Sequence, residues 1–214
     1  MMAVGWQAII FDFDGVVVES GDIKTQAFAD LYRPHGETVV AAVVQYHRLH
    51  GGMSRYQKFR YFQQHLLSKP PLTPDEEQEL DRQFSARVVE AVIASQAVPG
   101  ADEFIRQQAA RIPLFVASGT PETELNAIVT RRGLAPYFTG VRGSPTSKQA
   151  LIADILSIHA LTPERVLMIG DALIDYQSAQ LNGVAFLGRV RVGDDNPFPP
   201  QVETVADLSS LLTC

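Results

Sequence analysis

The sequence predicts an α/β fold in which a parallel sheet carries helices on both faces, with an α-helical segment inserted after the first strand. Two observations lead to this prediction. Short apolar runs, which are typical of buried strands, alternate with stretches whose apolar residues recur at helical spacing. The region directly after the first run contains helical patterns only. The expected strands lie at residues 7–13, 113–117, 165–169 and 184–187.

Helices are expected between the later strands, at residues 121–132, 146–159 and 174–181. Alternation of strands and helices implies right-handed crossovers, which make the strands parallel and cover both faces of the sheet. The inserted segment runs from about residue 22 to residue 97 and is interrupted by Pro70 and Pro71. Thr73, followed by a proline and acidic residues, is typical of the start of a helix within it.

Composition limits the possible functions. The chain has 214 residues, of which 46% are hydrophobic and 20% charged, as in a globular enzyme and unlike a disordered or fibrous protein. The net charge of −6 argues against a nucleic-acid partner, which requires a basic face. No apolar run approaches the roughly 18–20 residues that span a bilayer, so no membrane partner is expected. Cys214, the one cysteine, cannot form a disulfide within the chain, which favours a cytoplasmic location.

Two carboxylates follow the first expected strand. Asp12 and Asp14 are two positions apart and precede Gly15, which allows the backbone to turn away. Ligands bind at the carboxyl ends of strands in a parallel sheet. Acids at the end of so apolar a strand are costly unless a metal ion or a basic group neutralises them. The alternative, a pair of solvated loop acids, is common for Asp-x-Asp alone and stays open at this point.

The third expected strand ends in a similar way, with Gly170 and Asp171, and Asp175 follows four residues later. Carboxylate oxygens from two neighbouring strand ends suit a hard divalent cation, and they predict Mg²⁺ as the cofactor. A plain helix cap is the competing interpretation of Asp175.

Two weaker motifs lie between these strands. Ser118 and Gly119 follow the second expected strand, where a hydroxyl and free backbone N–H groups before a helix form an anion site. On their own they are better explained as a helix cap before Pro121. Lys148, at the start of the next expected helix, would by itself be interpreted as a surface charge.

Taken together, the four motifs resemble those of the haloacid dehalogenase superfamily of phosphotransferases, which use an aspartate nucleophile. The resemblance covers nearly the whole chain and implies a Rossmann-like core formed by residues 1–18 and 98–214. Residues 19–97 resemble the helical cap domain of the phosphoglycolate phosphatase and β-phosphoglucomutase branch. Ala172 departs from many relatives, in which a small hydroxyl residue follows the Gly-Asp pair, and little consequence is expected.

The resemblance implies a role for each motif residue. Asp12 is the nucleophile that forms an aspartyl-phosphate, and Asp14 is the general acid and base. Mg²⁺ is held by Asp12, the backbone carbonyl of Asp14 and Asp171, while Asp175 orients the metal's waters or the lysine. The phosphoryl oxygens are expected to bind Gly15, Ser118, Gly119 and Lys148.

Two cap residues are further candidates for substrate binding. Arg55 ends a Gly-Gly-Met-Ser-Arg sequence that resembles the branch's Gly-x-Ser-Arg substrate loop, so it is expected to contact the part of the substrate that is not transferred. A helix start with a solvent-facing Arg55 is an equal alternative. Lys24 occupies the position of the hinge histidine of mutase relatives and is expected to bind an anionic substrate. His47 and His50 are interpreted as surface histidines rather than metal ligands.

We therefore expect a Mg²⁺-dependent phosphatase that hydrolyses a small phosphorylated metabolite, either a sugar phosphate or a phosphoglycolate-like compound, and acts as a monomer or homodimer. A phosphomutase of the β-phosphoglucomutase type is the nearest alternative, and Lys24 in place of the hinge histidine favours hydrolysis over it. From another class, a phosphoreceiver or binding domain without turnover would also use a strand-end Asp with Mg²⁺. Such domains are shorter and lack the helical insertion.

Overall fold

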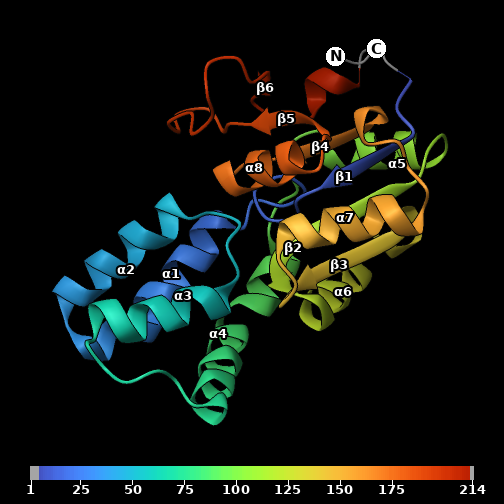
Figure 1. Ribbon diagram of the computed structural model, residues 1–214. Helices are drawn as coiled ribbons and strands as arrows, with labels where there is room; N and C mark the ends of the chain where they lie inside the picture. The colour runs from blue at the N-terminus through green and yellow to red at the C-terminus, as the bar shows by residue number, and fades with distance from the viewer. Residues whose placement is uncertain (1–4, 213–214) are drawn as a thin grey trace.

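The computed structural model describes residues 5–212, so residues 1–4 of the expected core and Cys214 lie outside the described part. Six parallel strands form one sheet in the order β3-β2-β1-β4-β5-β6 (Figure 1). They are β1 (Ala8–Phe11), β2 (Leu114–Pro121), β3 (Gly140–Ser144), β4 (Val166–Gly170), β5 (Ala185–Arg189) and β6 (Thr204–Val205). All four residues of β1 are buried, as expected for an apolar strand between two neighbours. The fold class predicted from the sequence is confirmed.

Residues of β1 alternate between two apolar cores, one on each face of the sheet. Ile9 and Phe11 belong to the core covered by α5 and α6, whereas Ala8 and Ile10 belong to the core covered by α7 and α8. The four helices are α5 (Ala101–Ala109), α6 (Glu122–Arg131), α7 (Lys148–Ile158) and α8 (Leu173–Leu181). Because both faces are packed, the open edge at the carboxyl ends of the strands is left for polar residues.

The segment from Gly21 to Ala94 contains helices and turns and no strand. The long helices are α1 (Gly21–Tyr32), α2 (Glu37–Leu49), α3 (Arg55–Tyr61) and α4 (Pro74–Ala94), which Figure 1 shows grouped beside the sheet. Aromatic rings hold them together: the Phe28 ring of α1 lies 4.4 Å from Phe84 of α4 and 6.0 Å from Phe59 of α3. The predicted helix start at Thr73 is also present, since its hydroxyl accepts a hydrogen bond from the Glu76 amide at 3.3 Å.

Two connectors join this helical segment to the sheet, and they run antiparallel beside each other. The amide of Val98 donates to the carbonyl of Val17 at 3.1 Å, and the amide of Glu19 donates to the carbonyl of Gln96 at 3.0 Å. Short helical turns complete the described chain, at Arg33–His35, Phe62–Leu66, Ala135–Tyr137, Pro163–Arg165 and Ser209–Leu211. Within residues 5–212, every helix falls short of the length or the apolarity needed to span a bilayer.

Three elements were not predicted from the sequence: β3, β6 and α5. β3 has a glycine at two of its five positions and a single apolar side chain, so it lacks the pattern of a buried strand. It pairs with β2 because Gly140 leaves room for the Phe115 ring, which a Cβ at residue 140 would approach to 3.2 Å. β6, at the edge of the sheet, has only two residues.

Candidate active site

Asp12 and Asp14 lie where the chain leaves β1, at the carboxyl edge of the sheet. Asp12 is 2% exposed, and its amide donates to the carbonyl of Ile169 in β4 at 2.9 Å. Its Oδ1 accepts a hydrogen bond from the amide of Phe13 at 2.7 Å. Gly15 has a φ of +77°, and a Cβ there would lie 2.0 Å from a carboxylate oxygen of Asp171. Glycine at this position therefore allows the loops after β1 and β4 to approach each other.

The acids after β4 complete a cluster with Asp12. One carboxylate oxygen from each of Asp12, Asp171 and Asp175 lies within 4.8 Å of the other two. The Oδ2 of Asp175 also accepts hydrogen bonds from the amides of Asp171 at 3.2 Å and Ala172 at 3.0 Å. Asp175 is the third residue of α8, so the N-cap position expected for it in the competing interpretation belongs to Ala172. Its carboxylate accepts from the helix start while also facing the cluster.

Lys148, the first residue of α7, joins the cluster from the helix next to α8 on the same face of the sheet. Its side chain is buried, with Nζ 2.9 Å from Oδ2 of Asp12 and also paired with Asp175. Burial by itself would lower the pKa of Lys148, but the charges of Asp12 and Asp175 outweigh it and raise the pKa. The amine is therefore a permanent cation between the two carboxylates, not the surface charge that a lone lysine would be.

The cluster of Asp12, Asp171 and Asp175 fits a hard divalent cation. Burial raises the pKa of Asp12 to about 7, reinforced by Asp175 and Asp14 and opposed by Lys148. Burial, together with Asp12 and Asp175, also raises the pKa of Asp171 well above its ordinary value. Three clustered carboxylates with one lysine carry more negative than positive charge, and their all-oxygen donors are those that Mg²⁺ prefers.

Asp14 has a different set of partners. Its Oδ1 accepts a hydrogen bond from the Ser20 hydroxyl at 2.6 Å, and its Oδ2 accepts one from the Thr120 hydroxyl at 2.9 Å. Lys24 of α1 forms an ion pair with the same carboxylate and donates to the Thr120 hydroxyl at 2.8 Å. Burial raises the pKa of Asp14, but Lys24 and these hydrogen bonds outweigh it, and the pKa is lowered overall. Lys24 therefore contacts the second motif aspartate itself.

The expectation that the strand ends at residue 117 and that Ser118 is part of a cap for a helix starting at Pro121 is wrong. β2 continues to Pro121 and α6 begins only at Glu122. The Ser118 hydroxyl is buried and accepts a hydrogen bond from the amide of Thr120 at 3.1 Å. The pairing of β2 with β3 shifts register between Ala117 and Pro121, which accommodates this irregular end.

A loop of the helical segment covers the cluster. Gly52, with a φ of +72°, comes so close to the core that a Cβ there would lie 2.7 Å from Ile174 and 3.4 Å from Nζ of Lys148. On the β2 side, a Cβ at Gly119 would lie 2.4 Å from the carbonyl oxygen of Gly52. Residues from the two parts of the chain are therefore in contact directly above Lys148.

Arg55 is neither solvent-facing nor grouped with the acids at the carboxyl edge of the sheet. It is 5% exposed, and its guanidinium binds Ser85 at 2.8 Å, Asp81 at 3.3 Å and Glu124. Glu124 belongs to α6 of the sheet layer, so this ion pair joins the helical segment to the core. The Arg55 guanidinium also lies 4.8 Å from the centre of the Phe84 ring.

Sequence reasoning missed several residues at the site. Thr120 had a usable signal, because alternation along a strand places it on the same face as Ser118. Lys58 had a weaker one, its i, i+3 spacing from Arg55 in α3. It is 2% exposed, and its Nζ lies 2.8 Å from Nδ1 of His47, which is half-buried rather than a surface histidine.

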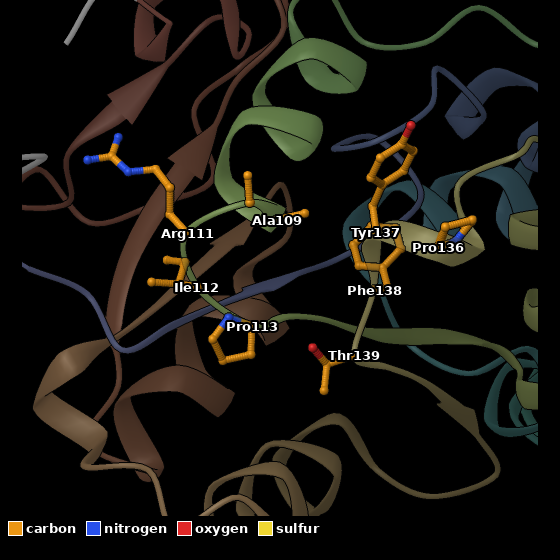
Figure 2. A pocket seen from close by; sticks show the side chains of 9 residues that line it. Ala109, Arg111, Ile112, Pro113, Pro136, Tyr137, Phe138 and Thr139 are labelled. Atoms are coloured by element: carbon orange, nitrogen blue, oxygen red, sulfur yellow. The ribbon is translucent and has the colours of Figure 1, made fainter.

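A cavity of about 480 Å³ lies elsewhere, at the amino ends of β2 and β3 (Figure 2). Its lining runs from Ala109 to Pro113 and from Pro136 to Thr139 and includes a single charged residue, Arg111. Because Pro113 precedes β2 and Thr139 precedes β3, this cavity is at the edge of the sheet opposite to Asp12. Its lining contains no acid and no lysine, unlike the cluster around Asp12.

Known proteins share this sequence pattern and fold. A family model described as haloacid dehalogenase-like hydrolase matches residues 6–183. A phosphoglycolate phosphatase from Synechococcus elongatus is 25% identical over 181 residues, which are 83% of this chain and 81% of that protein. A structure of a predicted phosphoglycolate phosphatase from Haemophilus somnus has a TM-score of 0.73 at 20% identity, with 97% of each chain covered.

The structure of β-phosphoglucomutase from Clostridium difficile has a TM-score of 0.76 at 14% identity, covering 96% of this chain and 93% of that one. These likenesses agree with the resemblance found in the sequence, and they confirm the expected enzyme class, a phosphatase-type hydrolase. Since the family model spans most of the chain, including every motif aspartate, the chain belongs to the haloacid dehalogenase-like hydrolase family.

Proposed function

We propose that this protein is a Mg²⁺-dependent phosphatase that hydrolyses a small organic phosphomonoester through an aspartyl-phosphate on Asp12. One observation carries the proposal. The two aspartates after β1 lie in different environments, Asp12 among acids with Lys148, and Asp14 among the donors Ser20, Lys24 and Thr120. Two carboxylates whose surroundings differ in this way are suited to separate roles, one as nucleophile and one as acid and base.

In the first half-reaction, a carboxylate oxygen of Asp12 attacks phosphorus, and the bond between phosphorus and the ester oxygen breaks. Asp14 gives its proton to the leaving alkoxide. In the second half-reaction, Asp14 takes a proton from water, whose oxygen attacks phosphorus, so that inorganic phosphate leaves and Asp12 is regenerated. With Lys24 in contact, Asp14 is held in its base form. Movement away from Lys24 would raise its pKa and let it carry the proton.

The other motif residues bind and orient. Asp12, Asp171 and the backbone carbonyl of Asp14 would hold Mg²⁺, which when bound neutralises the charge of the nucleophile and the phosphate. Lys148 stays close to Asp12 and offers a positive charge to the phosphoryl oxygens. Asp175 holds the amine of Lys148 in position through their ion pair. Backbone and hydroxyl groups of the strand-end loops complete the phosphate site, at Gly15, Ser118 and Gly119.

We further propose that residues 19–97 act as a cap over a core formed by residues 1–18 and 98–214. The contact of Gly52 with the Lys148 region and the ion pair of Arg55 with Glu124 support this division. A closed cap excludes water while the acyl phosphate forms. In this role Arg55 holds the cap to the core, which differs from the substrate contact expected from the sequence.

The likeness to a phosphoglycolate phosphatase supports the proposed substrate class, a small cytoplasmic metabolite that is either phosphoglycolate-like or a sugar phosphate. The test is phosphate release from a panel of phosphorylated metabolites with Mg²⁺ present. The proposal predicts turnover of at least one small monoester and loss of turnover in Asp12→Asn. Hexose 1-phosphate, supplied with its bisphosphate, belongs in the panel, and isomerisation faster than phosphate release would contradict hydrolysis as the function. Release of phosphate from no member would also contradict it.

A further inference from the structure

Lys58 differs from every other buried basic residue in the described chain. The buried basic residues of the described chain are Lys58 itself, Arg55, Lys148 and Arg189. Arg55 pairs with Glu124, Lys148 pairs with Asp12 and Asp175, and Arg189 pairs with Glu19 at 2.6 Å. Among residues 5–212, no carboxylate lies within 4.0 Å of the amine of Lys58. A buried cation without a counter-charge is costly, so its presence requires an explanation.

The nearest partners of Lys58 do not supply a negative charge. Its Nζ lies 2.8 Å from Nδ1 of His47 and 5.7 Å from the centre of the Phe28 ring. Burial, followed by the charges of Lys58 and Lys24, lowers the pKa of His47 to about 2, so the imidazole is neutral and its Nδ1 accepts the hydrogen bond. Burial and Lys24 lower the pKa of Lys58 to about 7.

Lys58 lies on the side of the cap that covers the catalytic acids. The carboxylates whose fields reach it are Asp14 and Asp171, both of which come from the core. The helix that carries it, α3, begins three residues after Gly52, which contacts the region of Lys148 and Asp175. The amine is therefore buried at the boundary between cap and core, within the field of the site to which substrate binds.

We propose that Lys58 binds a second anionic group of the substrate, a carboxylate or a second phosphate, at the end remote from the phosphoryl group that Asp12 receives. His47 is a positioning residue, because it holds the amine through Nδ1 without competing for the charge. The inference rests on the proposed function and narrows it: compounds with one anionic group, such as simple sugar monophosphates, are poor substrates. The second anionic group of the substrate supplies the negative charge that Lys58 lacks in the free protein.

The test compares substrates that differ in the second anion alone. Phosphate release is measured from 2-phosphoglycolate and from ethyl phosphate, which has the same two carbons without the carboxylate. A second pair, ribulose 1,5-bisphosphate and ribulose 5-phosphate, tests a second phosphate in the same way. The wild type is expected to prefer the doubly anionic member of at least one pair by about 10- to 100-fold in kcat/KM, the range of a charge-assisted hydrogen bond. The pair that shows it identifies the anion.

Lys58→Met, which keeps the length and removes the charge, is expected to abolish that preference, so the kcat/KM ratio falls by about 10- to 100-fold. Lys69→Met is the matched control: an exposed cap lysine whose loss leaves the ratio unchanged. A uniform loss on both substrates in Lys58→Met would indicate a merely structural role and overturn the inference. If that variant does not fold, the wild-type ratios decide, and values near one in both pairs overturn it.

Failure of the proposed function gives a different result. If the wild type releases phosphate from singly and doubly anionic esters equally well, only the second-anion inference is wrong. If it releases phosphate from no ester, the phosphatase assignment is wrong and the inference fails with it.

Discussion

The sheet edge and the cap handle buried charge in opposite ways. At the sheet edge, Lys148 is held between Asp12 and Asp175, and Asp14 is held by Lys24 and two hydroxyls. In the cap, Lys58 faces the same site with only a neutral histidine beside it. Groups that perform the chemistry must be fixed before substrate arrives, whereas a group that selects the substrate gains from a charge left unpaired. The difference supports the proposed division, with the chemistry in the core and the substrate selectivity in the cap.

The largest effect is expected from Asp12→Asn. Asparagine is nearly isosteric but lacks the carboxylate nucleophile, so kcat should fall by about 10⁴-fold or more, as for nucleophiles in other hydrolases. Phosphate release with Mg²⁺ measures the loss, and circular dichroism checks the fold. Asp154→Asn, an exposed aspartate of α7, is the matched control and should retain full activity. Near-normal turnover in Asp12→Asn would contradict the proposal that the Asp12 carboxylate is the nucleophile.

Removal of divalent cations tests the acid cluster as a whole. Activity should fall to background in excess EDTA and return on addition of Mg²⁺, because Lys148 alone does not balance the charge of three carboxylates. Asp171→Asn should raise the Mg²⁺ concentration needed for half-maximal activity. Unchanged turnover in EDTA would contradict the metal site, and an Asp171→Asn enzyme with the wild-type Mg²⁺ requirement would exclude this residue as a ligand.

The ion pair of Arg55 with Glu124 tests the connection between the two regions. Both side chains are almost fully buried, so removing one partner leaves an unpaired charge. Arg55→Met and Glu124→Gln should each lower the free energy of unfolding by about 3 kcal/mol, and the double variant should lose less than the sum. The exposed pair of Arg60 and Glu77 is the control, expected to contribute about 1 kcal/mol or less.

Strictly additive losses for Arg55 and Glu124 in urea unfolding would mean that they are not coupled. If Arg55 binds substrate instead, Arg55→Met would raise KM while Glu124→Gln would leave it unchanged.

The smallest effect concerns stability and pH at Lys58. Its pKa is about 7 in the folded protein against an ordinary 10.5, so the unfolded chain binds the proton more tightly. The cost to stability is therefore complete below pH 7 and disappears as the pH rises toward 10.5. Lys58→Met should raise Tm by at least about 2 °C at pH 6.5, and the gain should shrink at pH 10. A gain in Tm that is constant with pH, or that is equally large in Lys69→Met, would contradict the claim that the buried charge of Lys58 destabilises the protein.

The sequence predicts the sheet edge better than the cap because strand-end motifs are local. Asp12, Asp14, Asp171 and Asp175 follow apolar runs, and parallel strands place such ends together. The Lys148 contact with Asp12 comes from a helix start 136 residues later in the sequence, which spacing alone does not show. Only the family's order of motifs pointed to it.

The contacts within the cap and between cap and core depend on how helices distant in sequence pack against one another. The local sequence pattern does not predict that packing. The burial of Lys58 and its bond to His47 join α3 to α2, and neither residue is apolar. From the sequence, His47 is therefore interpreted as a surface histidine, and Lys58 is not singled out. Arg55 was likewise predicted from a motif to contact substrate, whereas Glu124 of α6 binds its guanidinium. Tertiary partners at a distance in sequence determine both positions.

The central claim is that Asp12 itself receives the phosphoryl group. It is tested by mixing the enzyme, Mg²⁺ and a doubly anionic substrate, quenching during turnover and reducing with borohydride, which converts an acyl phosphate to an alcohol. Peptide mass spectrometry should then find residue 12 converted to homoserine. Reduction at another carboxylate, or at none while phosphate is released at the normal rate, would contradict the account.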